Sequence, residues 1–362
     1  MESNVRRAVP VKMIWMFVCV SLVFTALGML SSASGSHFSL RTLEQAFNSA
    51  VPFLLLSLGA GLCACRGSLN LALPGIMGLS GLLFALINPE GQNAAVGFIA
   101  VLAIGGALGA LVGVFAIQSR RSVALVTGLS SLLLGGMFSA LTVLISEGAT
   151  VPIRGRIEYA PFAWIGLVLA LGLCFLGSLG LKKPAREISG GGRFVWTVVA
   201  GALAALAGAL QAVRMSTAVP TLGSGYNEQT IVPVLLAAGI LIPNARRSQG
   251  EAIFGLLSIV FAALAHAMTA TSFAMLALDF NVQRFIHAIL GTLFLIPNLL
   301  IYRSFRDDPP ATASTSTQTP PEKEPSYWDK TRKIVPDPEP DYEATRRVEP
   351  KAEEDYEATR RI

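Results

Sequence analysis

Residues 94–117 read AAVGFIAVLAIGGALGALVGVFAI, an apolar run that contains no charged residue. A transmembrane helix needs about 20 mostly apolar residues, so this run predicts a helix that crosses a lipid bilayer. Runs of the same kind flank it on both sides. The predicted spans are residues 11–30, 48–64, 68–87, 94–117, 122–146, 161–180, 194–213, 229–243, 251–272 and 284–302. The sequence therefore predicts an all-α polytopic membrane protein of about ten transmembrane helices.

The composition leads to the same class. Of the 362 residues, 52% are hydrophobic and only 14% are charged, whereas soluble domains carry about 25% charged residues. This balance excludes a soluble enzyme, a disordered chain and a secreted disulfide scaffold. The four cysteines lie in or at the ends of apolar runs, and none has the spacing of a usual zinc site. We interpret them as small buried residues and predict no metal site.

Two of the spans need separate interpretation. The first follows the basic residues Arg6, Arg7 and Lys12, as a signal peptide would. Its apolar run is longer than the usual core of a signal peptide, so we predict an uncleaved first helix. The eighth span, 229–243, is short and contains Pro233 and Pro243. It is open to interpretation as a half-helix or a re-entrant segment.

The distribution of basic residues predicts the orientation. If the N-terminus is cytoplasmic and ten spans alternate, 14 Lys and Arg of residues 1–306 fall inside and 5 fall outside. The outside ones are Arg41, Arg154, Arg156, Arg214 and Arg284. Cytoplasmic loops of membrane proteins carry an excess of Lys and Arg. We therefore predict a multi-pass protein with both termini in the cytoplasm.

The chain changes character after the last span. Residues 307–362 contain nine prolines, 14 acidic residues and no apolar period, and they repeat DYEATRR at 341–347 and 355–361. We predict a transmembrane domain over 1–306 and a disordered, Pro-rich acidic cytoplasmic tail over 307–362. The net charge of +5 sums a basic membrane domain and this acidic tail, so it does not indicate a nucleic-acid partner.

Ionisable residues are scarce inside the spans. His266 and His287 are the clear cases, with Glu251 at a helix start and Asp279 in a loop. Ion-coupled carriers usually place charged residues in the bilayer, so this scarcity argues against one. No GxxxxGK[ST] loop and no hydrolase motif occurs in the sequence. Any work that this protein performs must take its energy from another chain, and its uncharged spans favour a neutral solute.

Residues 66–81, RGSLNLALPGIMGLSG, interrupt an otherwise plain span with Gly, Pro and Asn. Backbone opened in this way is tolerated at membrane depth where it is buried or lines a cavity. The segment resembles the signature G-x-x-N-[IL]-[GA]-x-E-G of ABC importer permeases in the ribose, simple-sugar and nucleoside group, which includes branched-chain amino-acid permeases. The matching residues are Gly67, Asn70, Leu71, Ala72 and Gly75. Pro74 stands where the family usually has Glu, and Ala64 and Cys65 replace its acidic and basic pair.

Two further stretches carry the resemblance, which covers roughly residues 45–302. VTGLSSLLLGG at 126–136 is similar to the family helix after a short basic loop, here Arg120 and Arg121. AGALAALAGALQAV at 200–213 is similar to the small-residue helix after the loop that touches the ATPase. The resemblance implies a bundle like that of type II ABC importer permeases.

The resemblance also implies a function. It implies the permease subunit of an ATP-driven importer in a bacterial cytoplasmic (inner) membrane, carrying a small polar and neutral solute such as a nucleoside, riboflavin or a simple sugar. The expected partners are an ABC ATPase subunit that hydrolyses ATP, a second homologous permease subunit, an extracytoplasmic substrate-binding (lipo)protein and membrane lipid. The chain itself would be no enzyme and would hold no cofactor. The alternative is a membrane scaffold or assembly protein that docks partners through its tail.

Two groups of site residues are expected on this basis. Neutral polar residues beside the broken backbone are expected to face a wet substrate path, namely Asn70, Thr127, Ser130 and Ser131. The cationic inside loop 181–193, LKKPAREISGGGR, falls where relatives meet their ATPase. The expected contact residues are Lys182, Lys183, Arg186 and Glu187. A rival contact is 244–250, NARRSQG, which is also cationic and inside.

Overall fold

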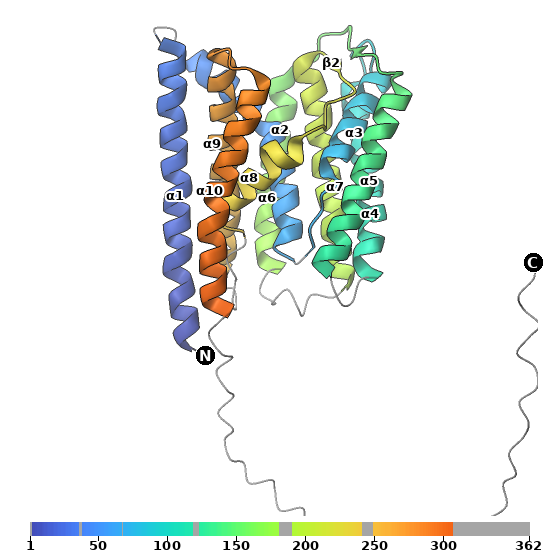
Figure 1. Ribbon diagram of the computed structural model, residues 1–362. Coiled ribbons are helices and arrows are strands. Elements are labelled where there is room, and N and C mark those ends of the chain that lie inside the picture. Colours follow the sequence, from blue (N-terminus) through green and yellow to red (C-terminus); the bar gives the residue numbers. More distant parts are fainter. Residues whose placement is uncertain are drawn as a thin grey trace, which may run out of the picture. The chain divides into compact units, whose positions relative to one another are not determined.

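The computed structural model describes residues 2–35, 38–66, 68–118, 123–180, 190–240 and 249–306. Most of this part of the chain is helical, and the helices run alongside one another (Figure 1). The long helices are α1 (Glu2–Ser34), α2 (Leu40–Ala64), α3 (Leu73–Ile87), α4 (Ala94–Gln118), α5 (Val123–Ile145), α6 (Tyr159–Gly180), α7 (Gly190–Met215), α9 (Gln249–Met275) and α10 (Phe280–Arg306). The predicted all-α polytopic class is confirmed.

The number of spans is less uniform than predicted. Within the described residues, seven helices are long and apolar enough to cross a membrane, and α3 and α6 contribute shorter apolar stretches. The eighth predicted span, 229–243, begins as a π-helical turn, η3 (Asn227–Ile231), and continues as the six-residue α8 (Val232–Ala237). Figure 1 shows α8 at mid-height in the bundle. The structure thus has short helical elements, η3 and α8, where the eighth span was predicted. It does not confirm a count of ten spans.

Burial separates central helices from peripheral ones. In α2, 83% of the most apolar 18-residue window is buried, and in α7 67%, whereas the figure for α10 is 17%. A lipid-facing helix surface needs no protein cover, because lipid tails are as apolar as leucine side chains. α2, α3 and α7 therefore form the centre, and their buried side chains include those of Leu55, Ile76 and Leu203.

Glycines allow the central helices to approach closely. A Cβ atom at Gly201 of α7 would collide with the carbonyl oxygen of Gly105 and with the backbone of Gly109 on α4. Likewise, a Cβ atom at Gly208 of α7 would collide with the carbonyl oxygen of Met77 on α3. Small residues serve this purpose at helix interfaces in lipid. The glycine-rich runs of α4 and α7 are thus the contact faces of these two helices.

Two stretches of non-helical backbone enter the bundle. The first, residues 68–70, follows the turn that ends α2 and precedes α3, whose first turn contains Pro74. The second follows α7, where β2 (Thr217–Ala218) pairs antiparallel with β1 (Val151–Pro152) before residues 219–226 lead into η3. A hydrogen bond joins the two regions, since Asn227 Nδ2 donates to the carbonyl oxygen of Leu71 at 3.0 Å. This junction positions the candidate site.

Candidate functional site

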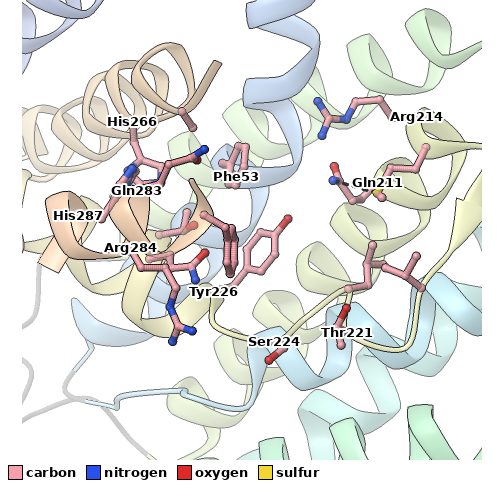
Figure 2. Close-up of a pocket in the computed structure, with 17 residues that line it drawn as sticks. Phe53, Gln211, Arg214, Thr221, Ser224, Tyr226, His266, Gln283, Arg284 and His287 are labelled. Atoms are coloured by element: carbon pink, nitrogen blue, oxygen red, sulfur yellow. Dashed lines mark hydrogen bonds between the residues drawn. The ribbon is translucent and has the colours of Figure 1, made fainter. Parts of the chain in front are cut away.

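A cavity of about 360 Å³ lies where the segment 219–230 meets α2, α7, α9 and α10 (Figure 2). Its lining residues include Phe53, Gln211, Arg214, Thr221, Ser224, Tyr226, Gln229, Thr230, His266, Gln283, Arg284 and His287. A second cavity of about 700 Å³ adjoins it, because the two share Phe53, Arg214 and Ala270 as lining residues. Residues of α2, α7, the segment 219–230, α9 and α10 therefore build one region of polar and aromatic side chains in the bundle.

Aromatic rings form one wall of the smaller cavity. Phe53 of α2 stacks on Tyr226, with ring centroids 5.6 Å apart and an interplanar angle of 22°. Phe53 also meets the His266 ring edge-on at 5.8 Å, and His266 meets His287 edge-on at 4.4 Å. Rings in such offset and T-shaped arrangements attract one another. The wall thus runs from α2 through α9 to α10 and offers both apolar faces and polar ring edges.

Two buried polar atoms of this cavity lack partners among the described residues. Gln211 is 5% exposed, its Nε2 lies 3.5 Å from Met215 Sδ, and its Oε1 has no hydrogen-bond partner. His287 is also 5% exposed, and its Nδ1 has no partner. A buried polar atom without a hydrogen bond costs about 1–3 kcal/mol. Gln211 and His287 both line the cavity, which makes their side chains candidates to bind a polar molecule inside it.

Arginines give the cavity its charge. Arg284 of α10 lies 3.1 Å from Glu228 Oε2, and their side chains are 45% and 76% exposed, so this pair is a weak surface one. Arg214, in the last turn of α7, makes no ion pair within the described residues. Arg156 lines the adjoining cavity. No Asp or Glu is among the described residues that line either cavity.

The residues expected along the substrate path lie elsewhere in the described structure. Asn70 is 1% exposed, and its Oδ1 accepts from the backbone N–H of Ala72 at 3.1 Å. Ser131 is fully buried, and its Oγ donates to the carbonyl oxygen of Leu69 at 3.3 Å. With Asn227, they fasten the broken backbone between α2 and α3.

The other two path residues lie on α5 with Ser131. Ser130 is half-buried, and the side chain of Thr127 lies outside the described part. Asn70, Ser130 and Ser131, the three whose side chains are described, do not line the two cavities described above. Their place on a substrate path stays a prediction.

The expected ATPase contact lies outside the described residues. This holds for Lys182, Lys183, Arg186 and Glu187, which fall within 181–189, and for most of the rival segment, within 241–248. The predicted tail, 307–362, is likewise outside them.

Sequence reasoning missed most of the cavity. Gln211 was visible as a polar residue in a helix of small ones, and Arg214 follows it by three residues, so the two share a helix face. This three-residue spacing was the pattern in the sequence that could have indicated a polar site on this helix face. Tyr226, Gln229 and Gln283 showed no such pattern, because they lie at or just before the starts of the predicted spans 229–243 and 284–302.

No family model matches the chain. The chain is 26% identical over 274 residues to the ribose import permease protein RbsC of Escherichia coli (strain K12), an alignment that covers 67% of this chain and 84% of the relative. It is 23% identical over 239 residues to the autoinducer 2 import system permease protein LsrC of Photorhabdus luminescens, covering 58% of this chain and 69% of the relative. The chain is thus a homologue of the ABC importer permeases of the simple-sugar family, as its motifs indicated.

Proposed function

We propose that this protein is the membrane-spanning permease subunit of an ATP-driven importer that moves a small polar solute across a bacterial cytoplasmic membrane. The cavity beside η3 carries this proposal. It lies where non-helical backbone meets helix ends, and discontinuous helices of this kind form the solute sites of many transporters. Relatives named as import permeases for ribose and autoinducer 2 support the same reading.

The lining favours a hydroxylated solute with an apolar face. Gln211, Gln229 and Gln283 present amides that both donate and accept hydrogen bonds, as sugar hydroxyls require. Phe53 and Tyr226 present ring faces to the C–H side of such a molecule. Small-molecule sites occupy about 300–1,000 Å³, so a cavity of about 360 Å³ suits a simple sugar.

The other two solute classes fit less directly. A nucleoside would extend toward the adjoining cavity, and riboflavin would need both. The expectation of a neutral solute rested on uncharged spans, whereas two arginines at helix ends line this cavity.

The mechanism that we propose is alternating access. The close glycine contacts between α4 and α7 hold these helices together, whereas hydrogen bonds from a few side chains hold the break at 68–72. A net hydrogen bond contributes only about 0.5–1.5 kcal/mol, so the break can rearrange at lower cost than the helix pair. ATP binding and hydrolysis would occur on a partner ATPase and reach the bundle through the loop 181–193. The coupling requires that the loop contacts differ between the two states.

The proposed complex contains more than this chain. A second homologous permease would complete the channel, and an extracytoplasmic substrate-binding (lipo)protein would deliver the solute. Both termini would lie in the cytoplasm, as the basic residues indicate. The alternative, a scaffold that docks partners through its tail, requires neither an ATPase nor the cavity.

Affinity purification and an uptake assay distinguish the transporter subunit from the scaffold. The full-length chain, expressed with its candidate ATPase, is expected to bring that ATPase through affinity purification and to support ATP-dependent uptake of labelled ribose, uridine or riboflavin in proteoliposomes. Gln211→Leu should lower this uptake about two- to tenfold, which is the range of one hydrogen bond. Gln92→Leu, the same change in an exposed loop, should leave uptake unchanged. A purified chain without an ATPase and without uptake would support the scaffold.

A further inference from the structure

The charge around the two cavities has one sign. Arg214 and Arg284 line the smaller cavity, Arg156 and Arg214 line the larger one, and no described lining residue is acidic. Arg284 is partly neutralised by Glu228, at 3.1 Å. Arg214 stands between the cavities and has no such partner within the described residues.

The position of Arg214 has an ordinary explanation that accounts for only part of the observation. It lies in the last turn of α7, where the helix dipole favours a cation. That effect does not fix the direction of the side chain. Figure 2 shows the Arg214 guanidinium directed toward Phe53, above the amide of Gln211. The side chain therefore reaches over the part of the cavity that Gln211 lines.

Closure of the cavity would raise the free-energy cost of the charge on Arg214. In the described state Arg214 is exposed, so water stabilises its charge. Alternating access would enclose the cavity around its solute and remove much of that water. A cation taken out of water is strongly destabilising unless an anion compensates it. A neutral sugar supplies hydrogen-bond acceptors but no compensating charge.

We propose that the solute carries an anionic group, a carboxylate or a phosphate, which the Arg214 guanidinium binds. The hydroxylated remainder would lie between Gln211 and the Phe53–Tyr226 wall, and Arg156 would attract the anion into the larger cavity. Arginine presents a planar fork of donors that matches both anions. This inference rests on the proposed function and specifies its substrate class.

The electrostatic part can be tested without transport. Thr221 lines the smaller cavity and is exposed, so Thr221→Cys, in a full-length chain whose four native cysteines are replaced by alanine, places a thiol there. We expect a negatively charged methanethiosulfonate reagent to modify this thiol faster than its neutral analogue. Arg214→Gln should lower the ratio of the two rates about tenfold. Arg154→Gln, at an exposed arginine that lines neither cavity, is the matched control and should leave it unchanged.

Solute protection tests the ligand class at the same thiol. Ribonate and ribose 5-phosphate should slow the modification at concentrations about 10- to 100-fold lower than ribose, the range of a hydrogen bond to a charged group. Arg214→Gln should abolish that difference. Protection by ribose at equal concentration, protection by none of the three, or protection only when the external binding protein is added would each overturn the proposal. Loss of ATPase co-purification and uptake with protection intact would instead refute the proposed function and leave the anion site standing.

Discussion

Two adjacent glycines of α4 provide a sharp test of the packing. A Cβ atom at Gly105 would lie 2.7 Å from the carbonyl oxygen of Gly201 and would collide with the Cβ of Ala205. At Gly106 the nearest atom would be Val198 Cγ1, at 3.7 Å, which is an ordinary contact. Gly105→Ala must therefore push α4 and α7 apart, and overpacking of this kind costs about 1–3 kcal/mol. Gly106→Ala meets no obstacle and gains up to about 1 kcal/mol of helix propensity.

Thermal unfolding of the purified chain in detergent measures this contrast. For a domain of this size, about 1 kcal/mol corresponds to roughly 2–4 °C in the midpoint. We expect Gly105→Ala to lower the midpoint by about 2–12 °C and Gly106→Ala to leave it unchanged or raise it. The two variants share residue type, helix and depth, so each controls for the other. Equal midpoints would refute the inferred contact between α4 and α7.

Three further predictions concern orientation, coupling and the break. Reporter fusions after Arg306 and within 147–160 should report opposite sides of the membrane; same-side signals would reject the orientation drawn from the basic residues. Replacing the four charged residues expected at the ATPase contact in 181–193 should weaken ATPase co-purification while membrane insertion persists, because several surface pairs of about 0–1 kcal/mol each are lost together. In the complex with the ATPase, a cysteine that replaces Asn70 or Ser131 should react with a water-soluble thiol reagent faster when ATP is added; no reaction in any state would leave both as packing residues.

Local sequence sufficed for the class of the fold. The apolar run at 94–117 became α4, and the short eighth span with Pro233 became η3 and α8. The glycines and proline of 66–81 also marked the interrupted backbone between α2 and α3. These features follow from hydropathy, proline and glycine, which act within a few residues of the chain.

The cavity came only from the tertiary structure. By sequence, Arg214 and Arg284 fall among the outside charges, and in the structure both line the cavity. Asn70, expected on the substrate path, instead accepts a hydrogen bond from the backbone N–H of Ala72. A side chain at a helix end has the same hydropathy whether it faces water, lipid or a cavity. Its environment depends on which distant helices pack beside it, and in this bundle α2, α9 and α10 bring their residues to the end of α7.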